Sequence, residues 1–203
     1  MKNQAAMFKL TYGLFVLSAK EGEKDNGCIV NTVQQVTDTP NRIAVTVNKS
    51  NYTHDMILKT GRFNVSILSE DASFEIFQHF GFQSGRDVDK FADWNDYERA
   101  ENQITYITKG TNGYLCGKVI ETMDLGTHTF FLAEVEDGDI LNDTESVTYS
   151  YYHKNIKPQP KETKKTGWRC KICGYVYEGE ELPPDFICPL CKHGASDFEK
   201  IES

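Results

Sequence analysis

Residues 168–191 read W-R-C-K-I-C-G-Y-V-Y-E-G-E-E-L-P-P-D-F-I-C-P-L-C. Cys170 and Cys173 form one C-x-x-C pair, and Cys188 and Cys191 form a second, with fourteen residues between the pairs. Two residues between paired cysteines is the spacing at which both thiolates face one metal ion. Two such pairs supply four sulfur ligands in tetrahedral geometry, which suits zinc or a single iron ion. Zinc there would be structural, whereas iron would also carry one electron.

The residues around the sulfurs favour iron. The segment is rich in aromatic side chains, namely Trp168, Tyr175, Tyr177, Phe186 and Phe198. A domain this small cannot bury enough apolar surface alone, so a metal ion would stabilise it, and a dry aromatic shell tunes the ion's potential. Gly174 follows the first pair, where a positive φ angle is easiest for glycine. Lys192 occupies the matching position after the second pair, where a left-handed backbone costs about 1–2 kcal/mol. Either that turn relaxes or the strain is tolerated.

The segment resembles rubredoxin, in the short form that occurs fused to other redox domains. The resemblance is carried by Cys-Lys-Ile-Cys-Gly-Tyr at 170–175, Tyr177, Pro183, Cys-Pro-Leu-Cys at 188–191, and Phe198. It implies one iron ion held by the four cysteines. Rubredoxins usually carry glycine where this chain has Lys192, a departure that concerns the local turn and not the ligands. The alternative is a structural zinc ribbon that recruits a partner.

Composition limits the class of protein. The 203 residues suffice for one medium domain and a small module, and 39% hydrophobic with 26% charged residues is typical of a globular chain. No run of 18 apolar residues occurs, so we expect no membrane partner and no transmembrane helix. The net charge of −8 argues against nucleic acid as a partner. Without an apolar export signal near Met1, we expect a cytoplasmic protein in which Cys28 and Cys116 are reduced, buried thiols.

The charge distribution divides the chain into three parts. Residues 153–167 contain five lysines, one glutamate and two prolines, with few apolar residues. This composition is typical of an extended, solvated linker, whose lysines keep it soluble or steer an acidic partner. We therefore predict a domain over residues 1–152, a linker over 153–167 and a metal module over 168–203.

Residues 1–152 are predicted to be mainly β-structure. The expected strands are rich in β-branched and aromatic residues and cover Tyr12–Ala19, Cys28–Thr37, Arg42–Asn48, Phe63–Leu68, Tyr114–Met123 and Thr127–Leu141. One short helix is expected to begin near Thr53, its N-cap, and to end before Gly61, and a second to run from about Ala72 to Phe80 and stop at Gly81. Many strands with two short helices indicate a closed or nearly closed barrel. No G-x-G-x-x-G follows a strand, which argues against a Rossmann domain.

The order of segments in this domain also points to a protein family. The relevant segments are Asn26–Thr37, Thr39–Val47, Asn48–His54, Gly61–Leu68, Asp89–Phe91, Tyr114–Cys116 and Gly126–His128. This order resembles the flavin reductase-like, FMN-binding split-barrel family, which includes flavoredoxin, over nearly all of residues 8–150. The resemblance implies a homodimer with FMN near the subunit interface.

The resemblance also implies residue roles. Asn31, Thr32 and Val33 would line the isoalloxazine and ribityl chain, and the residues that would hold the phosphate are Asn48, Lys49, Tyr52, Thr53 and His54. Free N–H groups and the dipole at a helix N-terminus favour an anion there. In the alternative reading Thr53 simply caps its helix and Tyr52 packs. Many relatives carry paired serines where this chain has Asn31-Thr32, which preserves hydrogen-bond donors.

Two further segments have two readings each. The loop His79–Arg86, with Phe80, Gly81 and Ser84, either closes over the flavin or is an ordinary polar loop. His128 either flanks the nicotinamide or has a structural role at the start of its strand.

Together the two halves predict electron transfer. A flavin accepts a hydride from NADH or NADPH and releases electrons singly, whereas an iron ion with four thiolates accepts one at a time. Hydride transfer needs no side-chain acid or base, so we expect no catalytic dyad. A flexible linker of fifteen residues spans about 20 Å. The resemblance implies a flavodiiron oxygen or nitric oxide reductase as acceptor. The alternative is an electron carrier that a separate reductase loads.

Overall fold

The structure, a computed structural model, describes residues 4–158 and 167–201. Its elements are η1 (Gln4–Lys9), β1 (Phe15–Glu21), β2 (Lys24–Val30), β3 (Gln34–Asp38), β4 (Asn41–Asn48), α1 (Tyr52–Thr60), β5 (Arg62–Leu68), α2 (Phe74–Gly81), β6 (Tyr97–Arg99), β7 (Thr105–Ile107), β8 (Thr111–Asp124), β9 (His128–Ile140), α3 (Tyr149–Tyr151), η2 (Tyr152–Ile156), β10 (Gly167–Cys170), β11 (Val176–Tyr177), η3 (Ala195–Asp197) and β12 (Phe198–Ile201). The prediction of a mainly β protein with short helices is confirmed.

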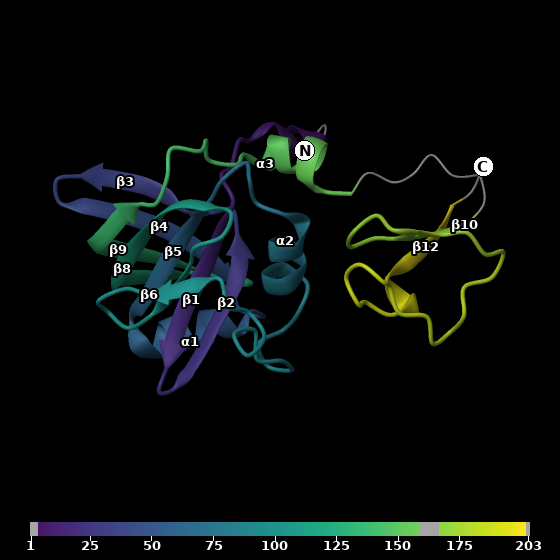
Figure 1. Ribbon diagram of the computed structural model, residues 1–203, viewed down its shortest axis with the longest axis horizontal. Helices are drawn as coiled ribbons and strands as arrows, with labels where there is room; N and C mark the ends of the chain where they lie inside the picture. The colour runs from purple at the N-terminus through teal and green to yellow at the C-terminus, as the bar shows by residue number, and fades with distance from the viewer. Residues whose placement is uncertain (1–3, 159–166, 202–203) are drawn as a thin grey trace.

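One antiparallel sheet of seven strands forms the larger domain, in the order β2-β1-β5-β8-β9-β4-β3. It curls around its own interior, as Figure 1 shows. Its first and last strands, β2 and β3, follow each other in the chain but form no ladder with each other in the described residues. The barrel is therefore split along this seam.

Two apolar layers follow from the burial of both faces of β1. Leu17 belongs to the barrel interior, together with Val45 and Phe131, while Val16 belongs to a second cluster outside the barrel. In that second cluster Phe80 of α2 covers the sheet. Because α2 covers one face of β1 and the barrel interior covers the other, β1 is buried continuously from Val16 to Ala19 rather than at every second residue.

Two sequence-based expectations about this domain were wrong in detail. The expected strand Cys28–Thr37 is broken after Val30 into β2 and β3. The expected N-cap Thr53 lies inside α1, whose N-cap is Asn51. Thr53 instead accepts a hydrogen bond from Asn26 Nδ2 at 2.9 Å. The expected helix end is confirmed, because Gly61 adopts φ +69° at the C-cap.

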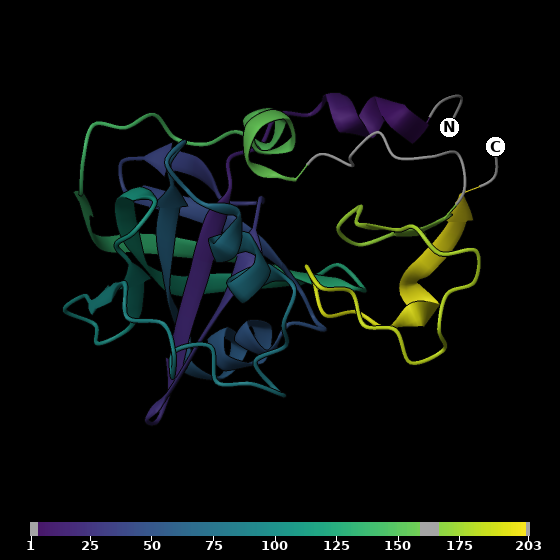
Figure 2. The ribbon, with the colours of Figure 1, turned by 45° about the vertical axis from the view of Figure 1, so that its right-hand side comes forward.

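The C-terminal part has its own small sheet, in the order β11-β10-β12, and its own apolar cluster around the four cysteines. In Figure 1, α2 lies on the side of the barrel toward this tail. Figure 2 shows η1 beside the helical segment α3–η2. Residues 152–156 are thus helical, although 153–156 were assigned to the linker; 159–166 lie outside the described residues.

Within the two described ranges, no helix combines the length and the apolar character that a membrane span requires.

Candidate functional sites

The four predicted metal ligands meet in one place. The Sγ atoms of Cys170, Cys173, Cys188 and Cys191 all lie within 4.8 Å of one another, and each residue is at most 1% exposed. The Sγ atoms of Cys170 and Cys191 are 3.5 Å apart, as are those of Cys173 and Cys188. Sulfurs arranged tetrahedrally at about 2.3 Å from one ion would lie about 3.8 Å apart. The cluster therefore fits a single metal ion.

The two turns that present the sulfurs have the same backbone geometry. Gly174 N donates to Cys170 O, and Lys192 N donates to Cys188 O, both at 2.9 Å. Gly174 adopts φ +82° and Lys192 adopts φ +62°. The turn at Lys192 has therefore not relaxed, and the strain of a left-handed lysine is tolerated.

Burial determines how the free thiols titrate. Burial raises the pKa of Cys173 to about 11 and raises the pKa of Cys191 further, and in each case a backbone N–H partly opposes the shift while the sulfurs of Cys188 and Cys170 add to it. Burial also acts to raise the pKa of Cys188, but the backbone N–H groups of Cys191 and Leu190, together with hydrogen bonds to the sulfurs of Cys191 and Cys173, outweigh it and lower that pKa. A thiolate-binding cation would compensate the cost of removing these protons, so the donor set fits a metal ion rather than four free thiols.

Aromatic side chains shield the sulfur cluster from water. Phe186 packs against Tyr177 and Phe198, with ring centroids 4.7 and 5.4 Å apart. Phe82, which follows α2 in the barrel domain, also packs against this cluster. The metal site thus has a dry shell to which both domains contribute.

A cavity of about 230 Å³ lies in the barrel domain beside the start of α1. Four of the predicted flavin residues line it, namely Tyr52, Thr53, Gly81 and Ser84. The other lining residues are Asn26, Cys28, Ser50, Asn51, Phe82, Gln83, Gly85, Lys90 and His193. The turn before α1 and the loop after α2, which are far apart in the sequence, thus form one site.

Lys90 places a buried cation at this cavity. It is 3% exposed, and its Nζ donates to Gly27 O at 2.8 Å and to Phe80 O at 2.9 Å. Burial lowers its pKa to about 8, which the nearby Cys28 partly opposes. An ammonium has three N–H donors, and two are used by these carbonyls. The third is available for an anion in the cavity.

An ion pair joins the loop after α2 to α1. Arg86 Nη2 lies 2.6 Å from Asp55 Oδ2, and the Arg86 guanidinium lies over the Tyr52 ring at 5.2 Å. The Lys24 ammonium lies over the same ring at 4.6 Å. Hydrogen bonds from His54 and Arg86 lower the pKa of Asp55. The ring of Tyr52, which lines the cavity, is thus in contact with two cations.

Other predicted residues lie close together at the ends of β4 and β9. Asn48 pairs with His128 in the register of these strands, and Lys49 Nζ lies 2.7 Å from Asp124 Oδ1. Thr32 Oγ1 donates to Thr46 O at 2.6 Å, which places the segment Asn31–Val33 beside β4. These residues flank the turn that lines the cavity.

Two predicted residues face elsewhere. Phe80 is 1% exposed and packs against Phe91 and Trp94 in the outer core. His54 is buried, with Nδ1 2.9 Å from Asp55 and Nε2 2.8 Å from Thr129 Oγ1. Both ring nitrogens of His54 are therefore engaged within the fold, and Phe80 contributes its carbonyl to Lys90 rather than its ring to the cavity.

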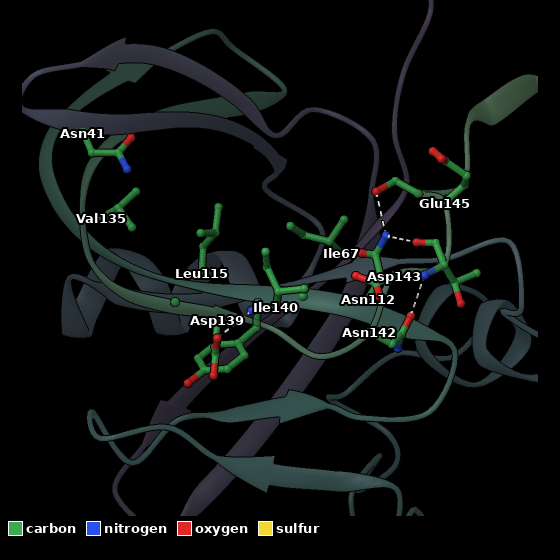
Figure 3. Close-up of a pocket in the computed structure, with 15 residues that line it drawn as sticks. Asn41, Ile67, Asn112, Leu115, Val135, Asp139, Ile140, Asn142, Asp143 and Glu145 are labelled. Atoms are coloured by element: carbon green, nitrogen blue, oxygen red, sulfur yellow. Dashed lines mark hydrogen bonds between the residues drawn. The ribbon is translucent and has the colours of Figure 1, made fainter.

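A larger cavity, of about 630 Å³, lies beside the first residues of β8 and is drawn in Figure 3. Asp139, Asp143 and Glu145 line it, and its fifteen lining residues include no lysine, arginine or predicted site residue. Three carboxylates would repel a phosphate, whereas Lys90 would attract one. A phosphorylated cofactor therefore fits the smaller cavity better.

Sequence reasoning missed Lys90, Asn26 and Cys28 as lining residues. Asp89-Lys90-Phe91 carried part of the family resemblance, but a lysine between an aspartate and a phenylalanine is usually exposed. A buried position for Lys90 follows only from the packing of α2 against β2. No signal in the local sequence indicates it.

Comparison with protein families matches residues 7–159 to the flavin reductase like domain. The chain belongs to the flavin reductase-like family. Residues 168–199 match the rubrerythrin, rubredoxin-like domain. Both resemblances drawn from the sequence are thereby confirmed: this member of the flavin reductase-like family carries a rubredoxin-like domain at its C-terminal side.

Curated relatives agree with this organisation. The chain is 37% identical to a high molecular weight rubredoxin of Moorella thermoacetica, over 97% of this chain and 98% of that protein. It is 35% identical to a ferric-chelate reductase (NAD(P)H) of Archaeoglobus fulgidus, over 73% and 87% of the two chains. These similarities place this flavin reductase-like protein among the oxidoreductases.

Solved structures support the fold. The flavoredoxin of Methanosarcina acetivorans superposes with a TM-score of 0.58 and 27% identity, covering 64% of this chain and 68% of that one. An NADH:FAD oxidoreductase of Streptomyces globisporus has a TM-score of 0.64 at 21% identity, covering 73% and 87%, a likeness that concerns the fold alone.

Proposed function

We propose that the chain is an NAD(P)H-dependent oxidoreductase that delivers electrons through FMN and a four-cysteine iron centre to an external acceptor such as a flavodiiron oxygen or nitric oxide reductase. One observation carries the proposal: a single chain joins a flavin reductase-like domain to a buried cluster of four thiolates. The similarity to the high molecular weight rubredoxin of Moorella thermoacetica, which extends over 97% of this chain and 98% of that protein, supports it. The proposal includes a homodimer formed through the split barrel.

FMN, when bound, would accept a hydride from the nicotinamide and release its two electrons singly. The chain's own residues would hold its phosphate in the smaller cavity. Lys90 supplies a positive charge there, and Thr53 and Ser84 supply hydroxyl groups. The backbone N–H groups at the start of α1 also favour an anion. Asn31–Val33, together with Asn48, Lys49 and His128, would flank the remainder of the cofactor.

The tail would hold iron, which supplies a one-electron change between its ferric and ferrous states. Cys170, Cys173, Cys188 and Cys191 would hold the ion as thiolates. Phe186 and Phe198 keep water from the sulfurs, so the ligands are protected and the local dielectric stays low. Each hydride contains two electrons, so two successive deliveries through one iron ion balance one nicotinamide oxidised.

The experiment is anaerobic stopped-flow reduction of the purified protein by NADH and by NADPH, together with metal analysis. We expect one iron per chain and a red ferric-thiolate absorption beside a yellow flavin band. The flavin absorption should be lost first and the ferric absorption second.

Each other outcome contradicts a stated part of the proposal. Zinc in place of iron would make the tail a structural ribbon. Reduction by dithionite but by neither nicotinamide would make the chain a carrier that another reductase loads. A flavin band that bleaches while the ferric band persists would refute transfer between the two centres.

A further inference from the structure

The second cysteine turn touches the flavin reductase-like domain. Gln78 Nε2 of α2 donates a hydrogen bond to Leu190 O, which lies between the paired cysteines of that turn. A cleft of about 200 Å³ separates the two surfaces. It is lined on one side by Glu75, Gln78, His79, Phe82 and Gln83 and on the other by Pro189, Leu190, Cys191 and Lys192.

The same turn also reaches the flavin cavity. His193 lines that cavity together with Tyr52, Thr53 and Lys90. The backbone fixes its position relative to the sulfurs, because Cys188 N donates to His193 O at 2.8 Å. His193 Nδ1 lies 3.0 Å from Cys191 O. Six consecutive residues, 188–193, thus contribute two sulfurs to the metal site and one lining residue to the cavity.

We propose that residues 188–193 form a docking turn that places the metal centre on α2 of the same subunit, with His193 completing the flavin cavity. The inference rests on the proposed function and specifies it. One electron would leave the reduced flavin and convert ferric to ferrous iron within one subunit, without crossing to the partner of a homodimer. FMN affinity and docking would then be coupled through His193.

The strained lysine fits this proposal. Lys192 holds a left-handed backbone that glycine adopts without strain, as Gly174 does in the first turn. Lys192 and Glu75 carry opposite charges and line the same cleft. The first turn shows the contrast: Ile172, which matches Leu190 in position, is 38% exposed. In this proposal the positive side chain at 192 serves the docking on α2, because Glu75 lines the same cleft from that helix.

The first test measures three full-length variants loaded with iron and flavin. Lys192→Gly should retain iron at least as well as the parent, because it removes backbone strain, yet slow flavin-to-iron transfer about two- to fivefold. Gln78→Ala should slow the same transfer about fivefold, since it removes one hydrogen bond, and leave flavin reduction by NADH unchanged. Ile172→Ala, at the matching place in the other turn, is the control and should change neither rate.

The second test needs no turnover. Fluorescence titration of iron-loaded protein with FMN should show that His193→Ala raises the dissociation constant about threefold or more, the size expected for one lost polar contact. Ile172→Ala should leave the constant unchanged. Hydrogen exchange of the α2 amides should quicken in Gln78→Ala, because the docked turn no longer covers that end of the helix.

The third test concerns the subunit. Lys90→Met, expected to bind FMN poorly, is mixed with Cys170→Ser, expected to bind flavin without iron, and the subunits are allowed to exchange. We expect no rapid reduction of the iron in the mixture; rapid reduction would overturn transfer within one subunit.

The outcomes separate the two proposals. If the parent protein never transfers electrons from flavin to iron, the proposed function fails. If it does, but Lys192→Gly, Gln78→Ala and His193→Ala all match the Ile172→Ala control, the docking turn is refuted and the function stands. Should Lys192→Gly lose its metal, Gln78→Ala and His193→Ala still decide, since neither replaces the residue whose left-handed backbone closes the second cysteine turn.

Discussion

Lys90 supplies a buried positive charge to the cavity that we propose for the flavin phosphate. Its folded pKa of about 8 lies below the ordinary 10.5, because burial disfavours the charged ammonium. Between these two values the unfolded chain binds more protons than the folded one, so the contribution of Lys90 to stability rises as pH increases from about 8. An anion in the cavity offsets this cost by stabilising the charged form. A buried lysine with one spare donor is therefore better suited to binding than to stability.

The first prediction is a pH-dependent affinity for FMN. Flavin phosphate is largely a dianion above pH 7, so the affinity should fall as Lys90 loses its proton above about pH 8. Riboflavin, which lacks the phosphate, is the control. Cys28, Tyr52 and His193 are the other titratable groups that line the cavity, and their titration would affect the binding of both flavins. Fluorescence titration between pH 7 and pH 10 measures both constants.

The matched substitution is Lys90→Met, which keeps the aliphatic length and removes the charge. A hydrogen bond to a charged group contributes about 1.5–3 kcal/mol, so FMN binding at pH 7 should weaken roughly tenfold to a hundredfold. Its pH dependence should flatten to that of riboflavin. A variant that binds FMN as tightly as the parent would place the phosphate outside this cavity.

At the scale of elements, the break between β2 and β3 shapes the predicted flavin-lining segment. Thr32 Oγ1 donates to Thr46 O at 2.6 Å and accepts from Thr46 N at 3.2 Å. One hydroxyl thus replaces a pair of ladder hydrogen bonds and holds the irregular residues 31–33 against β4. Regular pairing of β3 with β4 begins at Gln34, opposite Ala44.

We predict that Thr32→Val destabilises the barrel, although valine matches threonine in shape. It leaves two half-buried backbone groups of Thr46 without their partner, which costs about 1–3 kcal/mol of unfolding free energy. Thr32→Ser keeps the hydroxyl and should remain within about 0.5–1 kcal/mol of the parent. Urea unfolding measures both. Equal midpoints for the two variants would show that the hydroxyl bridge does not stabilise the segment.

The elements also show what the sequence alone could predict. The C-x-x-C spacing and the left-handed position at Gly174 depend on local geometry, so they were visible in the sequence, whereas the backbone at Lys192 was left open between two alternatives. Strand Cys28–Thr37 was predicted too long because the Thr32–Thr46 bridge is a tertiary contact. The N-cap was misplaced at Thr53 for the same reason, since Asn26 recruits that hydroxyl across the fold. The contact between Gln78 and Leu190 joins residues 112 positions apart and has no local signature.

At the scale of the whole molecule, the tail and the barrel depend on different sources of stability. The barrel has two extended apolar clusters, whereas the apolar cluster of the tail consists of the four cysteines with a few aromatic and leucine side chains packed around them. Metal binding in such small domains contributes on the order of 10 kcal/mol of folding free energy. Removing the metal should therefore unfold residues 167–201 and leave the barrel folded.

This prediction can be checked by chelation followed by thermal unfolding and hydrogen exchange. In full-length protein without metal, the midpoint temperature of the barrel's main unfolding transition should stay within a few degrees of the parent value. Loss of the docking contact would cost about 1 kcal/mol, which lowers the midpoint of a domain of this size by about 2–4 °C. Amides of β10 and β12 should exchange freely. Cys170→Ser should behave like the chelated protein. Cys116→Ser, a buried barrel thiol away from the sulfur cluster, should retain one metal ion per chain. If the tail amides stay protected without metal, aromatic packing alone holds that fold, and the cysteines are then free to serve electron transfer without a structural role.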